Sequence, residues 1–169
     1  MNTKNIVIFT ASEQKNLELA NNFIGKLTEL GAKVDLINIL DLDLPLFSSR
    51  TSDKYEAQDL LAKYLPTISS ATGMVFIAPE YNGSTPPSFS NFLAWLSRSS
   101  KDWRAHLNGK PAVIATFSAG GGFGVLYTMR NQLAFIGMNV LGRQILTHFN
   151  KPLEPESLNA VCEELIKLS

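Results

Sequence analysis

Short apolar runs alternate with longer segments of helical periodicity along the whole chain. Five of the runs predict β-strands, at residues 5–10, 33–39, 73–78, 112–117 and 139–146. The third run, GMVFIA, is continuously apolar, as expected of a strand buried on both faces of a parallel sheet. The second run, KVDLINI, alternates more, which suits an outer strand of the sheet.

Helical spacing of apolar residues predicts the elements between the strands. The clearest helix is 13–30, and Gly31 is well placed to end it. Its apolar face consists of Leu17, Ala20, Phe23, Ile24, Leu27 and Leu30. Further helices are expected at 54–65, where Pro66 complicates the last turns, at 88–97, at 125–136 and after Pro155 to the end of the chain.

Strand and helix therefore alternate five times. This alternation predicts an α/β fold, a single three-layer domain over residues 1–169 with a five-stranded parallel sheet and helices on both faces. The expected strand order is 2-1-3-4-5. Right-handed crossovers then bring the loops after strands 1, 3 and 4 together at the carboxyl edge, where open α/β sheets bind their ligands.

Charge and cysteine content exclude several classes of protein. Fifteen basic residues balance fifteen acidic ones, which argues against a nucleic-acid or membrane surface. No apolar stretch approaches the roughly 20 residues of a membrane span, and the chain opens on a strand, so we expect no span and no signal peptide. Cys162 is the single cysteine. It excludes an intrachain disulfide and fits a reducing cytosol, and its place in the last helix indicates packing.

The first loop, residues 10–16, leads into a helix. A helix N-terminus offers unpaired N–H groups and a partial positive charge, which attract phosphate. Thr10 and Ser12 add hydroxyl groups, and Lys15 adds a full charge. The alternative is that Ser12 only caps the helix.

The second loop, residues 79–87, is polar, stiff and aromatic. Pro79 and Tyr81 offer surface to a flat heterocycle such as a flavin, and the amides of Tyr81 and Asn82 offer donors to its polar edge. The alternative is a structural turn in which Glu80 hydrogen-bonds within the loop.

The third loop, residues 118–124, has four glycines in seven residues. Glycine lets a backbone approach a ligand closely. The glycine spacing does not match the dinucleotide-binding fingerprint, and the loop follows strand 4 rather than strand 1. The alternative is a flexible turn.

Isolated side chains elsewhere suggest no further chemistry. His106 and His148 have no metal-ligand spacing around them, so we expect no metal site. No Ser-His-Asp or Cys-His set is indicated. An apolar stripe in the helix 88–97 predicts core first and a subunit interface second; it consists of Phe89, Phe92, Trp95 and Leu96.

The three loops carry a resemblance to the NADPH-dependent FMN reductase family, which has the flavodoxin-like fold. The most specific match is Pro79-Glu80-Tyr81-Asn82, followed by Ser84, Pro86, Asn91 and Trp95. Other matches are Gly109-Lys110-Pro111, Ser118-x-Gly120-Gly121, Asp43-Leu44-Pro45-Leu46, and Arg130, Leu133 and Gly137. The first loop departs from the usual G-S-x-R pattern: Ala11-Ser12 replaces Gly-Ser, the loop is shorter and the arginine is absent, so the donors for a phosphate are fewer.

The resemblance implies FMN as cofactor and NAD(P)H as co-substrate. The first loop would hold the phosphate, and the second and third loops would hold the isoalloxazine ring. The cofactor-binding residues expected are Thr10, Ser12, Gln14, Lys15, Asn16, Pro79, Glu80, Tyr81, Asn82, Ser118, Ala119, Gly120 and Gly121. No catalytic acid or base is assigned.

The resemblance also implies a function. We expect a cytoplasmic oxidoreductase that passes electrons from NAD(P)H through FMN to a small-molecule acceptor such as a quinone, an azo compound or a metal oxyanion. We expect a homodimer or homotetramer, with the helix 88–97 as the candidate interface. The alternatives are a flavin reductase that releases reduced FMN, and a non-catalytic flavin-binding or regulatory protein.

Overall fold

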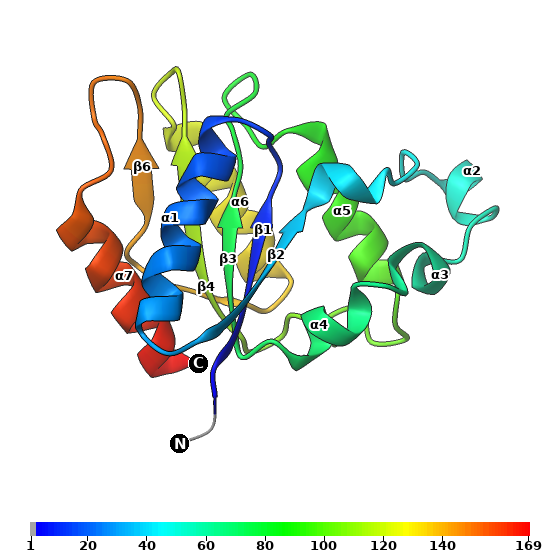
Figure 1. Ribbon diagram of the computed structural model, residues 1–169. Helices are drawn as coiled ribbons and strands as arrows, with labels where there is room; N and C mark the ends of the chain where they lie inside the picture. Colours follow the sequence, from blue (N-terminus) through cyan, green and yellow to red (C-terminus); the bar gives the residue numbers. More distant parts are fainter. Residues whose placement is uncertain (1–2) are drawn as a thin grey trace.

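The computed structural model describes residues 3–169 and confirms the predicted α/β fold (Figure 1). The strands are β1 (Asn5–Thr10), β2 (Lys33–Asn38), β3 (Gly73–Ile77), β4 (Pro111–Phe117), β5 (Asn139–Val140) and β6 (Ile145–Thr147). They form one parallel sheet in the order β2-β1-β3-β4-β5, with β6 also paired to β4. The expected order 2-1-3-4-5 is therefore confirmed.

The fifth predicted strand, 139–146, is interrupted. Two short strands, β5 and β6, pair with successive parts of β4. Between them, Gly142, Arg143 and Gln144 are exposed. These residues have little preference for a strand, and their side chains bond elsewhere: Arg143 contacts Glu164 at 3.4 Å, and Gln144 accepts a hydrogen bond from Arg130.

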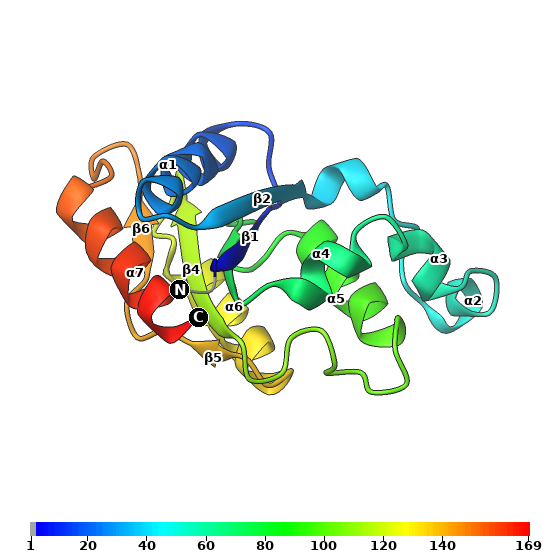
Figure 2. The same cartoon turned by 60° about the horizontal axis from the view of Figure 1, so that its bottom comes forward.

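Helices cover both faces of the sheet (Figures 1 and 2). On one face lie α1 (Lys15–Glu29) and α7 (Pro155–Leu168), and on the other lie α5 (Pro87–Arg98) and α6 (Phe123–Phe135). A 3₁₀ helix, η1 (Ile39–Leu42), and three short helices connect β2 to β3: α2 (Ser49–Ser52), α3 (Ala57–Leu61) and α4 (Leu65–Ser70).

The prediction of a single helix at 54–65 is wrong. The segment holds α3 and the start of α4 instead, and Pro66 lies in the first turn of α4. A proline fits the first helical turn because it has no N–H to pair there. Pro66 therefore begins a helix and does not disturb the end of one.

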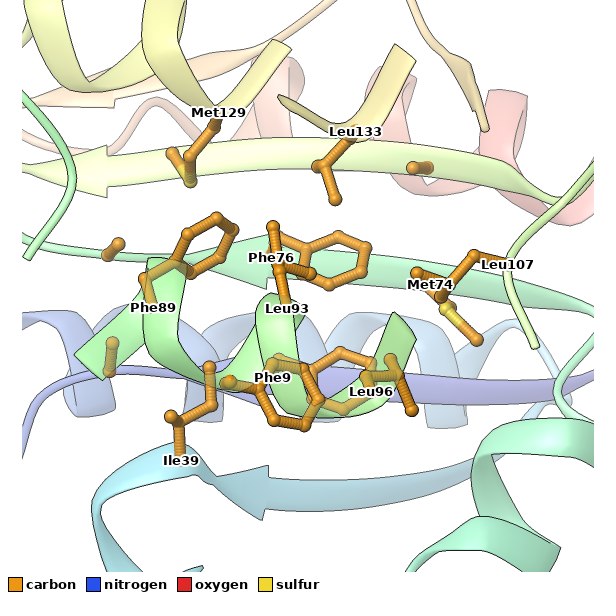
Figure 3. Close-up of a cluster of buried hydrophobic side chains, with 14 of the residues drawn as sticks. Phe9, Ile39, Met74, Phe76, Phe89, Leu93, Leu96, Leu107, Met129 and Leu133 are labelled. Carbon is orange, nitrogen blue, oxygen red and sulfur yellow. The ribbon is translucent and has the colours of Figure 1, made fainter. Parts of the chain in front are cut away.

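Alternating side chains of the central strands feed two cores. Ile6, Ile8 and Val75 face α1 and α7, and this core includes Cys162. Burial raises the pKa of the Cys162 thiol to about 12, and the thiol is fully buried, which confirms its packing role. Phe9 and Phe76 face α5 and α6, and their rings stack with centroids 4.9 Å apart (Figure 3).

The apolar stripe of α5 belongs to this second core, so the expectation that it forms a subunit interface is wrong. Phe89, Phe92, Trp95 and Leu96 are each at most 1% exposed. Trp95 Nε1 donates to the Pro45 carbonyl at 2.7 Å, and its ring meets Phe47 edge to face. Asn91 accepts from the Phe47 N–H and donates to the Pro45 carbonyl. The Asn-x-x-x-Trp motif therefore fastens the segment after β2 to α5.

Replacing Trp95 by Phe should lower the free energy of unfolding by about 1–3 kcal/mol, because the Pro45 carbonyl loses the shorter of its two hydrogen bonds and the contact with Phe47 shrinks. Urea unfolding measures the loss. Trp103→Phe is the control, since Trp103 is 41% exposed and its replacement should change stability by about 0.5 kcal/mol or less. Equal losses at the two positions would contradict the fastening role of Trp95.

Candidate functional site

Three loops begin at the same edge of the sheet, where β1, β3 and β4 end. Thr10 of β1 is in register with Ile77 of β3, which is in register with Ala115 of β4. The loops that follow these strands, residues 10–16, 79–87 and 118–124, therefore gather at the carboxyl edge, at the top of Figure 1. We call them loops 1, 2 and 3.

A cavity of about 520 Å³ lies between loops 1 and 2. It is lined by Ala11, Ser12, Glu13, Gln14, Lys15, Asn16, Leu40, Pro79, Tyr81, Pro86, Pro87 and Ser88. Six of the expected site residues are among them, namely Ser12, Gln14, Lys15, Asn16, Pro79 and Tyr81. Leu40 was not expected. Strand order is the signal that could have found it, because β2 lies beside β1 and its exit reaches the same edge of the sheet.

Loop 1 offers the cavity a helix N-terminus. The helix α1 begins at Lys15, and the first N–H groups of a helix have no intrahelical acceptor. The N-cap residue is Gln14 and no side chain caps the helix, so the alternative that Ser12 caps it is wrong. Ser12 Oγ accepts only the Gln14 N–H, in a long hydrogen bond of 3.4 Å. Amide donors and a partial positive charge at this end suit an anion.

Asn16 joins loop 1 to β4. Its Oδ1 accepts the Phe117 N–H at 2.7 Å, and its Nδ2 donates to the Phe117 carbonyl at 2.9 Å. The side chain is 3% exposed. Although Asn16 lines the cavity, its side-chain amide is hydrogen-bonded to the backbone of Phe117. Only its main-chain N–H is therefore left to bind a ligand.

Loop 2 folds into a tight Asn-Gly turn. Tyr81 and Ser84 exchange two backbone hydrogen bonds of 2.9 and 3.0 Å, and Asn82 and Gly83 between them have φ values of +52° and +72°. Two consecutive positive φ angles are typical of a type I′ turn. The Tyr81 N–H is consumed by this turn, so the expectation that it donates to a ligand is wrong. The Tyr81 ring is 54% exposed at the cavity wall.

The Glu80 carboxylate joins loop 2 to loop 3. Its Oε2 accepts from Ser118 Oγ and from the Gly122 N–H, both at 2.8 Å, and its Oε1 accepts from the Gly124 N–H at 3.1 Å. Both oxygens are therefore occupied by protein donors. The alternative that Glu80 hydrogen-bonds within its own loop is therefore wrong, because these three partners lie in loop 3.

These contacts also set the charge of Glu80. Burial by itself raises the pKa of the carboxyl group, but the hydrogen bonds from Gly122, Ser118, Val125 and Gly124 outweigh burial and hold the pKa below 4.5. Glu80 is consequently an anion at neutral pH. It has no proton to donate to a substrate under those conditions.

Two glycines of loop 3 serve the packing of loops 2 and 3. Gly122 has φ +72° and precedes α6, a conformation that side chains rarely adopt. A Cβ on Gly124 would fall on the Gly83 carbonyl oxygen of loop 2. Ser118 is buried, whereas Ala119, Gly120 and Gly121 are exposed. None of these four lines the cavity, so loop 3 is attached to the site through Glu80 and stands beside it.

Within residues 3–169, no group of three or more His, Cys, Asp or Glu side chains is placed to hold a metal ion. In the same part of the chain, no helix is long and apolar enough to cross a membrane.

The fold is that of known flavoproteins. The flavoenzyme NAD(P)H:(acceptor) oxidoreductase FerB from Paracoccus denitrificans superposes with a TM-score of 0.75 at 19% identity, covering 98% of this chain and 97% of that one. A flavodoxin from the domain Archaea superposes with a TM-score of 0.64 at 14% identity, covering 96% and 94%. At these identities the likeness concerns the fold, which is flavodoxin-like as expected.

Sequence comparison gives the family. The quinone reductase of Escherichia coli (strain K12) is 32% identical over 103 residues, which are 60% of this chain and 53% of that protein. The matched part thus spans about half the length of this relative. Residues 5–151 match the sequence pattern of the family described as NADPH-dependent FMN reductase. The chain therefore belongs to the NADPH-dependent FMN reductase family, and the resemblance noted in the sequence is confirmed.

Replacing Glu80 by Gln should lower the free energy of unfolding at pH 7 by about 1.5–3 kcal/mol, the size of a hydrogen bond to a charged group. Because the folded-state pKa of Glu80 is lowered, its stabilisation is complete at a pH above the ordinary pKa of a glutamate side chain and is lost as the pH falls through the lower pKa of the folded state. The gap between wild type and variant in urea unfolding should close at acid pH. Glu163→Gln, at an exposed site on α7, is the control, and an equal loss there would contradict the role of Glu80.

Proposed function

We propose that this chain is an FMN-dependent NAD(P)H oxidoreductase that passes electrons to a small acceptor such as a quinone. One observation carries the proposal: the 520 Å³ cavity lies at the carboxyl edge of a flavodoxin-like sheet and is lined by loops that the family match includes. FMN would supply the redox chemistry, since its isoalloxazine ring accepts a hydride and returns electrons to an acceptor.

The residues of the cavity fit the parts of FMN. Loop 1 supplies amide donors, the Ser12 hydroxyl group and Lys15 for the phosphate. Pro79 and Tyr81 supply an apolar and aromatic wall for the ring. Loop 3, whose residues 119–121 are exposed, would meet the ring from beside the cavity. Gln14 and Asn82, both exposed, complete the proposed contacts.

Positioning is the main task of the protein in this proposal. Glu80 fixes loop 3 against loop 2 and stays ionised, so we assign it no part in proton transfer. A quinone that gains electrons takes up protons from solvent or from a group outside the described cavity. The half-exposed ring of Tyr81 leaves one side of the site open, where nicotinamide and acceptor can enter in turn.

An FMN titration of the purified protein, followed by its visible spectrum, tests the proposal. Saturable binding, with NAD(P)H oxidation that depends on added quinone, is the expected result. Absence of binding for both FMN and FAD would contradict it and favour a non-catalytic role.

If FMN binds but leaves the protein during gel filtration, and turnover saturates with free FMN, the chain is a flavin reductase that releases reduced FMN. The short loop 1 is the observation that favours this second candidate.

We further propose that the chain forms a homodimer or homotetramer and works in the cytoplasm. The support for association is an aromatic stripe on α6, where Phe123, Tyr127 and Phe135 are 72%, 76% and 70% exposed and lie at a spacing of four and eight residues. Exposed apolar patches of this kind mark interaction surfaces.

The support for a cytoplasmic location is the single cysteine of the chain. Cys162 is free and buried, which suits a reducing compartment.

Replacing Tyr127 by Lys should lower the mass measured by light scattering, because a charge would be buried in the interface. Phe149→Lys is the matched control: Phe149 is 73% exposed but lies on the β6–α7 connection. A mass that is unchanged by Tyr127→Lys, or changed equally by both substitutions, would contradict an interface on α6.

A further inference from the structure

The acidic residues of loop 1 are unusual for a phosphate subsite. Glu13 lines the 520 Å³ cavity beside Lys15, and Glu18 follows one turn later in α1. Two carboxylates and one ammonium group leave the segment 10–18 with one net negative charge. A phosphate monoester carries a charge between −1.5 and −2 at neutral pH, so the net side-chain charge of the segment opposes its binding and only the helix N-terminus and Lys15 favour it.

Lys15, the one cation of the segment, is already paired. Its Nζ lies 2.8 Å from Glu18 Oε2, and the two side chains are 52% and 64% exposed. Lys15 lines both the 520 Å³ cavity and a neighbouring cavity of about 280 Å³, whereas Glu18 lines only the smaller one. The ion pair therefore lies toward the smaller cavity, and a phosphate in the larger one must compete with Glu18 for the ammonium group.

The other groups of loop 1 compensate little for this competition. The Asn16 amide is bonded on both sides to Phe117. The Thr10 hydroxyl donates within the loop to the Ser12 carbonyl at 3.4 Å. What remains for a phosphate is the Ser12 hydroxyl, the neutral Gln14 amide and the backbone N–H groups at the start of α1, whose dipole attracts anions only modestly at an exposed site.

We propose that Glu18 is a specificity-determining residue that suppresses the preference of this site for a phosphorylated flavin. By holding Lys15, it leaves the phosphate with weak neutral donors, so the site takes riboflavin nearly as well as FMN. The walls that receive the ring, Pro79 and Tyr81, are the same for both flavins. This inference rests on the proposed function, because it concerns the same flavin cavity.

Flavin fluorescence quenching measures the dissociation constants of FMN and riboflavin for the apoprotein, without any turnover. In the wild type, FMN should bind less than about tenfold more tightly than riboflavin, the limit set by a helix N-terminus and one shared ion pair. In Glu18→Gln, the freed Lys15 should tighten FMN binding by about 1.5- to 5-fold, the range of an exposed ion pair. Riboflavin binding should stay unchanged, and added salt should reduce the gain for FMN.

The chain offers a matched control on the same helix. Lys26 and Glu29 form an ion pair of 2.7 Å with the same spacing, at the far end of α1. Glu29→Gln should leave both dissociation constants unchanged. Circular dichroism of both variants should match the wild type, because the replaced carboxylates are about two thirds exposed.

The possible failures are distinguishable. FMN binding about a hundredfold or more tighter than riboflavin, the factor that one strong charge-assisted hydrogen bond supplies, would overturn the inference and leave the proposed function standing. So would an FMN to riboflavin ratio that Glu18→Gln does not change, or that Glu29→Gln changes equally. Failure of both flavins to bind would overturn the proposed function and this inference together.

Discussion

The carboxylate of Glu80 holds the candidate site together. Parallel strands are joined by their ladders only as far as the sheet extends, and beyond Ile77 and Phe117 loops 2 and 3 have to be held by other means. Glu80 accepts hydrogen bonds from Ser118, Gly122 and Gly124, and Asn16 does the corresponding work between loop 1 and β4. Two polar side chains thereby connect the loops where the backbone ladders end.

Within one short motif, some residues hold the loops together and others line the cavity. In Pro79-Glu80-Tyr81-Asn82, the glutamate is bonded to loop 3, the asparagine forms the turn, and the proline and tyrosine line the cavity. A group that anchors a loop through both of its oxygens has no free capacity for acid–base chemistry. The site therefore relies on shape, backbone donors and a cofactor, as expected of a flavin protein.

Much of the fold could be predicted because four of the strands are buried or paired along their whole length. The runs at 5–10, 33–39, 73–78 and 112–117 match β1, β2, β3 and β4 within a residue, since short runs rich in Val, Ile and Phe are typical of strands. Segments at the periphery were harder. The run 139–146 breaks at Gly142, and Pro66 begins a helix, because local side-chain contacts decide such positions.

The site was predictable to the level of loops and not to the level of atoms. Sequence order and strand order bring loops 1, 2 and 3 to one edge, and Leu40 follows from the same order. The partners of Glu80 and Asn16 depend on contacts between residues 38 to 101 positions apart. The Tyr81 N–H, in contrast, bonds to the nearby Ser84 carbonyl within a local Asn-Gly turn. Periodicity likewise identifies the apolar face of α5, but only the burial of its side chains in the structure decides between core and subunit interface.

Amide chemical shifts of the ¹⁵N-labelled protein, recorded during an FMN titration, test the location of the site most directly. The account predicts that the largest shifts fall on residues 12–16 and on Tyr81, which line the 520 Å³ cavity, and on Asn82 next to Tyr81, with smaller shifts at 119–121 in loop 3. Gly122 and Gly124, whose N–H groups stay bonded to Glu80, should move little. Shifts concentrated around Phe149 and Leu153, which line the smaller cavity, would contradict the assignment of the flavin site.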